Sequence, residues 1–370
     1  TSDLSPAAIR ESVRAACDIA RYTAEDECAG LADPALLATE FPDLDLYHPW
    51  DLTIDEALAI STDCEAAALA MDPLISNSEG ATLNTEAGVG VYGNSNGFNH
   101  GYPISRHSIS CSVIAKEKDE MQRDYWYSTA RHSEDLETAV AVGERAARRA
   151  LDRLGARKLQ TQQSPVIFKA ELAAGLLRSF VSAIRGSALY RQATFLLDAL
   201  DTQVFPDWVR IEENPHLPRG LASAPFDSEG VATRRRDLIT DGILKGYVLG
   251  SYSARKLGLQ TTGNAGGVRN LSIGMGDMNL QQLMREMGTG LVVTELMGQG
   301  VNTITGDYSR GAAGYWVENG EIAFPVEEIT VAANLRDMFR NLVAVGNDDD
   351  YSSSVRTGSW LIESMMIAGE

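Results

Sequence analysis

The chain has 370 residues, 44% of them hydrophobic, and a formal net charge of −19 at pH 7. This length exceeds what a single core fills, so at least two domains are expected, each with a packed core. The acidic balance excludes nucleic-acid binding, which needs clustered Lys and Arg, and no run of eighteen apolar residues is present that would form a membrane-spanning helix.

The first 155 residues combine helix signals with short β-type runs. Ser5 and Pro6 suit the N-cap and first turn of a helix whose apolar residues share one face. A second helix is predicted from Thr53 to about Met71, with acidic residues in its first turn. Residues 75–129 have the pattern of an antiparallel meander with a turn at residues 94–97, and a third helix should end at Gly155.

A polar stretch, residues 156–165, separates this region from a β-rich remainder. A buried strand (165–169) and an apolar helix (170–186) come first, and Asp241-Gly242 predicts a hairpin turn. Together the patterns predict an α+β protein, in which a helix and antiparallel meander region is followed by a barrel-like or sandwich-like C-terminal domain. The expected divisions are 1–44, as the end of an N-terminal α/β domain whose earlier part is absent, 45–155 as a central α/β region, and 160–370 as the β-rich domain.

The stretch from Leu291 to Asn334 is rich in both glycine and β-branched residues. It contains three β-type runs, at Leu291–Leu296, Val301–Thr305 and Ala313–Val317, and a hairpin dipeptide at Asn319-Gly320. Glycines among β-branched residues predict bulges or close approach of another backbone. We expect these strands to offer an edge on which an extended peptide or a partner subunit lies.

The string TELMGQGVNTITGDYSRGAAGYWVENGEIAFPVEEIT resembles the C-terminal signature of the TldD/PmbA family, in its PmbA (TldE) branch. SPVIF, PFDSEGVATRRRDLITDGILKGYVLGSYSARKLGLQTTGNAGG and EMGTGLVV extend the resemblance upstream. It is specific from Ser164 onward and looser before. The resemblance implies a subunit of a cytoplasmic TldD–TldE metalloprotease that acts on peptides or unfolded small proteins, in the maturation of peptide antibiotics and the degradation of antitoxins.

The active branch of this family carries a His-Glu-x-x-x-His helix just after the strand that corresponds to PVIF. The matching positions here are Ala170, Glu171 and Gly175, so Glu171 remains and neither histidine does. The active branch also uses a late cysteine, near which this chain has Gly346. The resemblance therefore implies no catalytic residue, no metal and no cofactor in this chain, with zinc expected in a TldD-like partner.

The sequence supplies no replacement for that motif. The five histidines show no i, i+4 pairing, and no GxSxG nucleophile elbow occurs. The four cysteines have no ligand spacing and are expected to be reduced thiols of a cytosolic protein.

Nine further residues are candidates for contact with substrate or partner, because they fall in the turns and glycine-rich segments that carry the resemblance. For the carboxylates, internal ion pairs that shape a turn are the preferred interpretation and peptide contact is the alternative. The candidates are Asp227, Glu229, Gly263, Asn264, Gly298, Gly300, Asp307, Arg310 and Gly311.

Two functions from different classes follow. In the first, the chain is the non-metal-binding subunit that pairs with a TldD-like metalloprotease subunit and walls a shared peptide cleft. In the second, it acts alone, as a homodimer or larger homo-oligomer that binds peptides or a regulatory protein without proteolysis. A third interpretation, that this chain is itself a metalloprotease, requires ligands that the sequence does not contain.

Overall fold

The computed structural model describes residues 1–349 and 352–369. Its first helix, α1 (Pro6–Tyr22), begins as predicted, with the Ser5 side chain accepting a hydrogen bond from the Ala8 N–H at 3.3 Å. No residue of α1 is buried. The segment that follows is tied to the C-terminal part of the chain by an ion pair between Asp26 and Lys256 at 2.9 Å.

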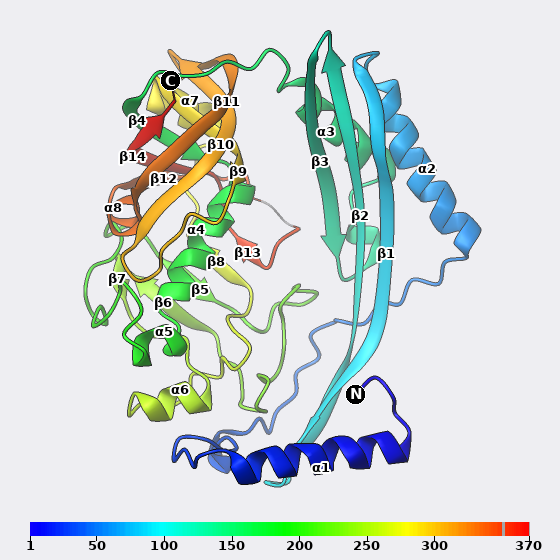
Figure 1. Ribbon diagram of the computed structural model, residues 1–370, viewed down its shortest axis with the longest axis vertical. Coiled ribbons are helices and arrows are strands. Elements are labelled where there is room, and N and C mark those ends of the chain that lie inside the picture. Colours follow the sequence, from blue (N-terminus) through cyan, green and yellow to red (C-terminus); the bar gives the residue numbers. More distant parts are fainter. Residues whose placement is uncertain (350–351, 370) are drawn as a thin grey trace.

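The predicted meander is present as a three-stranded antiparallel sheet in the order β1-β2-β3. Its two long strands run almost the full height of the molecule (Figure 1), and α2 and α3 pack on one face of it. Apolar side chains from both helices and all three strands form a core of their own. The elements are α2 (Ile54–Ala70), β1 (Ile75–Gly93), β2 (Asn99–Glu117), β3 (Glu120–Ala130) and α3 (Ala139–Leu151).

The C-terminal part contains a closed five-stranded barrel with the strand order β11-β10-β9-β4-β14, closed by pairing of β14 with β11. Only the β4–β9 pair is parallel within it, and β12 adds to β14. The strands are β4 (Gln162–Phe168), β9 (Gly290–Met297), β10 (Asp307–Glu318), β11 (Glu321–Asn334), β12 (Leu342–Val345) and β14 (Trp360–Ala368).

A second, smaller sheet of five short strands has the order β13-β8-β5-β6-β7. Short helices connect it to the barrel, and α4 follows directly after β4. These elements are α4 (Ala170–Ala183), α5 (Gly186–Tyr190), β5 (Ile211–Glu213), β6 (Arg236–Thr240), β7 (Ile243–Leu244), α6 (Ser251–Lys256), β8 (Leu271–Ile273), α7 (Leu280–Met287), α8 (Leu335–Arg340) and β13 (Val355–Arg356).

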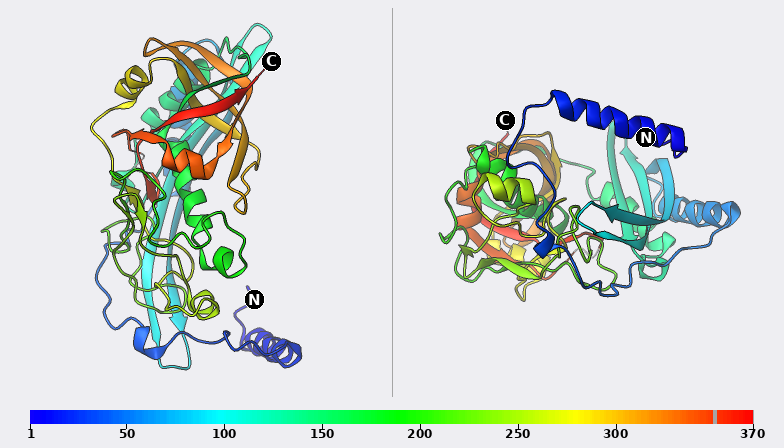
Figure 2. Two further views of the ribbon diagram at one scale, coloured as in Figure 1. Left: turned by 90° about the vertical axis from the view of Figure 1, so that its left-hand side faces the viewer. Right: turned by 90° about the horizontal axis from the view of Figure 1, so that it is seen from below.

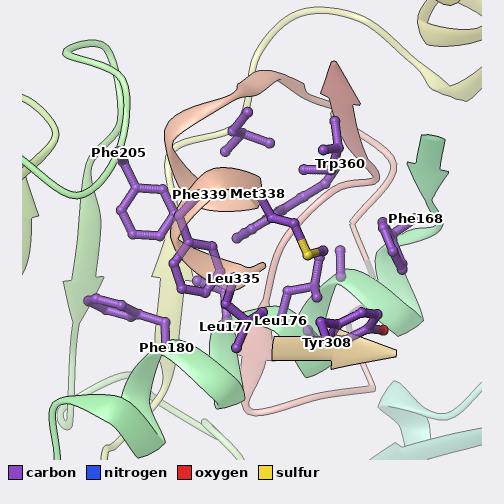
Figure 3. Close-up of a cluster of buried hydrophobic side chains, with 14 of the residues drawn as sticks. Phe168, Leu176, Leu177, Phe180, Phe205, Tyr308, Leu335, Met338, Phe339 and Trp360 are labelled. Carbon is purple, nitrogen blue, oxygen red and sulfur yellow. The ribbon is translucent and has the colours of Figure 1, made fainter. Parts of the chain in front are cut away.

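The largest core joins the barrel, the small sheet and α4, and aromatic rings lie at its centre (Figure 3). Phe205 stacks on Phe339 with ring centroids 4.9 Å apart, and Phe180 meets Phe205 edge to face at 5.4 Å. Trp360 is fully buried beside them. Rings of this size remove a large apolar area from water, so this cluster fixes α4 against the barrel.

Both predicted hairpin dipeptides are confirmed. Asp241 and Gly242 have φ of 51° and 72°, and Asn319 and Gly320 have φ of 54° and 78°, as a type I′ turn requires. The predicted β-run at Val301–Thr305 is wrong, because beyond a single bridge at Val301 the backbone turns there. The Asn302 side chain accepts hydrogen bonds from the N–H groups of Ile304 and Thr305, and this local bonding outweighs β propensity.

The predicted fold class is confirmed as α+β, with a helix and meander region followed by a β-rich domain that is a barrel rather than a sandwich. The three-stranded sheet stands beside the barrel with β3 nearest to it (Figure 1 and Figure 2). Among the described residues, no helix combines the length and apolar character needed to cross a membrane.

Candidate functional site

A cavity of about 550 Å³ lies where the three-stranded sheet meets the C-terminal part. Trp126 of β3 and Arg145 of α3 line one side of it, and the first residues of α4, Ala170 and Glu171, line the other. The packing of α4 against the barrel core therefore holds Glu171 at the cavity. Charged side chains of both signs complete the lining: Arg131, Asp135, Glu137, Arg219, Asp348 and Asp349.

Glu171 is held between two cations. Arg149 donates from Nη1 to Glu171 Oε1 at 2.9 Å, and the Lys169 Nζ lies 3.7 Å from the same oxygen. Burial alone would raise the pKa of Glu171, but the charges of Lys169 and Arg149, together with a backbone N–H, outweigh burial and leave the pKa lowered. Glu171 is therefore ionised at neutral pH, which suits a charge partner and disfavours a general base, whose pKa should lie near the working pH.

A relay of charged side chains crosses from α3 and β3 to the barrel. Arg149 Nε also donates to Asp124 at 3.1 Å, and Asp124, whose side chain is only 7% exposed, lies 3.5 Å from Arg153. Arg153 in turn reaches Glu295 of β9 at 2.6 Å. Burial lowers the pKa of Arg149, but the charges of Asp124 and Glu171 overcome this effect and leave the pKa raised. The relay Glu171–Arg149–Asp124–Arg153–Glu295 thus connects α4 to β9 through α3 and β3.

Trp126 forms a rigid wall of the same cavity. The Arg145 guanidinium carbon lies 3.6 Å from the centre of the Trp126 ring, and the Arg149 guanidinium carbon lies 5.3 Å from it. Both distances are within the range of a cation–π interaction. The indole Nε1 donates to Glu137 at 3.0 Å. With its ring face and its N–H both engaged, Trp126 is fixed in one orientation.

Two strand edges border a second cavity of about 220 Å³, which shares Trp126 and Glu171 with the first. One is β3, the edge strand of its sheet, through residues 123–127, where the Arg123 carbonyl accepts from Arg153 at 3.0 Å and the Tyr125 N–H donates to Asp124 at 2.7 Å. The other is the end of β9, at residues 294–296, where the pairing with β4 stops at Phe168–Val293. Backbone groups at such edges can hydrogen-bond to an extended chain.

Of the glycine-rich strands predicted to supply this edge, β9 does so at its end, from residue 294, and β10 does not. Strand β10 lies between β9 and β11, so both its edges are paired, and β9 is paired on both sides up to Val293. The glycines serve close packing instead: a Cβ on Gly314 would lie 1.9 Å from the carbonyl oxygen of Val292.

Four of the predicted contact residues lie in one group around α6. Asp227 is buried, and its carboxylate accepts hydrogen bonds from the N–H groups of Glu229, Val231 and Ala265. Burial raises the pKa of Asp227 in spite of these bonds. Glu229 accepts from the first N–H of α6 at 2.9 Å. In this group the carboxylates shape turns.

Gly263 and Asn264 complete that group. Gly263 has φ +73°, and a Cβ there would lie 2.6 Å from the carbonyl oxygen of Ala232. The buried Asn264 amide accepts from Arg236 at 2.7 Å and donates to Glu213 at 2.6 Å. Both polar ends of the Asn264 side chain are thus used within the chain.

The other five predicted contact residues lie around the β9–β10 connection. Asp307 accepts from Thr305 at 2.6 Å, and Arg310 donates to the Leu296 carbonyl at 3.3 Å. Gly298 has φ +78°, and Gly300 leaves no room for a side chain, since a Cβ would lie 1.5 Å from the Ser309 oxygen. Gly311 packs against Met297. Neither group of predicted residues lines the two cavities at Glu171.

Comparison with known proteins identifies the family. Residues 47–154 match the PmbA/TldA metallopeptidase central domain, and residues 161–369 match the PmbA/TldA metallopeptidase C-terminal domain. The chain belongs to the TldD/PmbA family, in its PmbA (TldE) branch. It is 56% identical over all 370 residues to Metalloprotease PmbA of Escherichia coli O157:H7, of which it covers 82%.

Two solved structures share the fold. A putative modulator of DNA gyrase from Bacteroides thetaiotaomicron is similar with a TM-score of 0.94 and 31% identity, over 100% of this chain and 85% of that one. TldE from Thermococcus kodakarensis is similar with a TM-score of 0.83 and 20% identity, over 99% and 85% of the two chains.

Family membership raises the question of whether this position fits a catalytic zinc. A zinc site needs three protein ligands, and Ala170 and Gly175 have no donor atom in their side chains. The remaining group, Glu171, is already neutralised by Arg149 and Lys169, whose charges repel a divalent cation. The residues at this position in the PmbA (TldE) scaffold therefore do not fit the metal.

Sequence reasoning missed most of the residues around the cavity. Trp126, Asp124, Arg149 and Glu295 belong to no recognisable sequence motif. The one available signal was the i, i+4 spacing of Arg149, in α3, and Arg153, in the turn that follows α3. Two cations this close in the sequence call for carboxylates near them.

Proposed function

We propose that this chain is the non-metal-binding subunit of a TldD–TldE metalloprotease, in which a TldD-like partner supplies the zinc and the chemistry. The observation that carries the proposal is the state of Glu171. This carboxylate keeps its place at the start of α4, but two cations neutralise it and its pKa is lowered. A family scaffold is retained here around a position whose side chains suit structure rather than metal chemistry.

The substrate in this proposal is an extended peptide or an unfolded small protein. The strand edges of β3 and β9 at the second cavity carry main-chain donors and acceptors, which tolerate many sequences because they bind backbone. On β3 the Arg123 carbonyl accepts from Arg153 and the Tyr125 N–H donates to Asp124, so a bound peptide would replace these internal hydrogen bonds. The larger cavity, which is lined by both arginines and carboxylates, adds polar contacts. This chain would thus position the peptide, and positioning alone can lower a reaction barrier by about 7–11 kcal/mol.

We place the complex in the cytoplasm. All four cysteines are free thiols, and Cys64 and Cys111 are buried in the core beneath α2 and α3, where thiols persist in a reducing compartment. The same proposal assigns no cofactor to this chain and one zinc to the partner. Maturation of a peptide antibiotic and removal of an antitoxin are the two activities to assay.

The decisive experiment compares this chain, a TldD-like subunit and the co-purified pair for zinc content and peptide cleavage. We expect zinc in the partner and in the pair but not in this chain, and cleavage that is fastest in the pair. Cleavage by this chain alone that a chelator abolishes would overturn the proposal. So would a pair that cleaves no faster than the partner alone.

The alternative is a stand-alone homo-oligomeric protein that binds peptides without cutting them. The cavity of about 550 Å³ favours it as much as it favours the shared cleft, because both functions need a place for a chain segment. The same experiment separates the two functions. A stand-alone binder would retain labelled peptide in the absence of the partner and would not increase the rate at which the partner cleaves the peptide.

A further inference from the structure

The outer edge of β1 is an unusually long free strand edge. Within the described part of the chain, β1 (Ile75–Gly93) pairs only with β2, so all 19 residues have one unpaired side. The lower part of β1 and β2 extends beyond α2 and α3 as a two-stranded arm (Figure 1). Natural sheets protect such edges with lysine, proline or a covering segment, and β1 contains no lysine, arginine or proline.

The arm is fixed on one side by contacts within the chain. Tyr92 and Phe98 have ring centroids 5.9 Å apart, and Phe98 meets Phe226 of the C-terminal part at 5.1 Å. These rings hold the arm against the rest of the molecule. Its edge is therefore ordered before any partner arrives, which lowers the entropic cost of pairing.

The residues of this edge are small or apolar and open to solvent. Val89 and Val91 are 66% and 68% exposed, on the same face of the arm because their spacing is two residues. A Cβ added to Gly88 or Gly90 would meet nothing within 4 Å, so the face on which side chains would stand at these two positions is open. Only Glu86 is charged between residues 80 and 93.

We propose that residues 87–91 of β1 pair antiparallel with the same residues of a second copy of this chain. A two-fold axis at Val89 sets Val89 opposite its own copy, Ala87 opposite Val91, and Gly88 opposite Gly90. Every pair then matches in class, with apolar side chains facing each other on one side and glycines on the other. Shifting the axis by one residue sets Tyr92 or Glu86 opposite a glycine and loses this match.

The charges also fit this register. With the axis at Val89, Glu86 lies opposite Tyr92, so the two Glu86 carboxylates stand six residues apart along the paired strands, roughly 20 Å at the rise of a β-strand. For a chain of net charge −19, a neutral edge is the place where two copies meet with least repulsion. The joined sheet would have six strands, with β1 of each copy at its centre. This inference does not rest on the protease role.

The first test is the mass of the purified chain by sedimentation equilibrium from about 1 to 100 μM. We expect a reversible dimer, and we expect Val89→Lys combined with Val91→Lys to raise its dissociation constant by about tenfold or more, because like charges then lie across the two-fold axis. Both positions are exposed, so thermal melting should be unchanged. A monomer over the whole range, or a dimer indifferent to the two lysines, would overturn the proposal.

The second test fixes the register by cross-linking. In a Cys17→Ser, Cys28→Ser background, Val89→Cys places two thiols opposite each other, and mild oxidation should give a covalent dimer. Val140→Cys, at a 46% exposed site on α3, is the matched control and should stay monomeric on the gel. Equal cross-linking at both positions would refute the pairing. The proposal would also be refuted if the β1 edge bound a TldD-like subunit and the chain did not associate with itself.

Discussion

Replacing Glu171 by glutamine tests the central structural claim, because it removes a charge and little else. In the folded chain the variant loses the 2.9 Å ion pair with Arg149, whose side chain is 19% exposed and keeps Asp124 as a partner. Exposed pairs contribute about 0–1 kcal/mol and breaking a buried pair costs about 3–5 kcal/mol, so we expect a loss of about 1–2 kcal/mol. At 2–4 °C per kcal/mol, the melting temperature should fall by roughly 2–8 °C.

The pH dependence of this loss has a definite sign. The folded pKa of Glu171 lies below its ordinary value of 4.5, so its stabilisation is fully present above about pH 5 and disappears as the pH falls through the folded pKa. The difference in unfolding free energy between wild type and Glu171→Gln should therefore stay at about 1–2 kcal/mol from pH 6 to 8 and become smaller below about pH 4. Urea titrations at a series of pH values measure it.

The catalytic consequence separates the two roles of a carboxylate. If Glu171 is only a charge partner, kcat of the complex with a TldD-like subunit should change by less than about tenfold, whereas loss of a general base costs about 10²–10⁴. Glu328→Gln, at a 66% exposed side chain paired with Lys158, is the control for charge removal. A fall of a hundredfold or more in a complex that remains folded and assembled would show that Glu171 takes part in the chemistry.

Three further predictions concern metal, charge and glycine. The isolated chain should hold less than about 0.1 zinc per chain after dialysis, measured by elemental analysis, because Ala170 and Gly175 provide no ligand; one tightly held zinc would refute this. Arg149→Met should lower the free energy of unfolding in urea by about 3 kcal/mol, because Asp124 and Glu171 lose their shared partner. Unchanged stability would show that the relay does not stabilise the fold. Gly300→Ala should lower the free energy of unfolding by more than about 2 kcal/mol, because the added Cβ would lie 1.5 Å from the Ser309 carbonyl oxygen. Gly311→Ala should lower it by less than about 1 kcal/mol, because its Cβ would lie 3.3 Å from the Met297 Cβ. Equal shifts of the melting temperature would contradict this prediction.

The parts of the fold that sequence predicts are those set by a few neighbouring residues. The Ser5 cap, the helix start at Thr53 and both hairpin dipeptides depend on bonds that span two to four positions, and each forms where the pattern indicates. The same locality explains the error at Val301–Thr305. There the hydrogen bonds of the Asn302 side chain are as local as those of a helix cap, but the β-branched residues around Asn302 favoured the prediction of a strand instead of a turn.

The candidate site depends on residues that are distant in the sequence. Arg149 and Glu171 are 22 positions apart, and Arg153 and Glu295, which are 2.6 Å apart in space, are 142 positions apart in the sequence. Closure of the barrel depends on β11 meeting β14, and the pairing of β10 with both β9 and β11 leaves β10 without the edge expected in the glycine-rich stretch. No local pattern encodes such meetings, so composition and motif could place Glu171 on a helix but could not find its partner Arg149.

The arrangement of charges also explains how the cavity can be both polar and rigid. Asp124 is 7% exposed and Arg153 15% exposed, so each would destabilise the fold if it lost its partner. Because every member of the relay neutralises the next, the wall between α3, β3 and β9 keeps one arrangement, and Trp126 is held against it by Arg145. The edges of β3 and β9 are thereby held at a fixed separation. A surface that binds main chain gains affinity from such pre-organisation, since neither edge has to be ordered when an extended peptide enters.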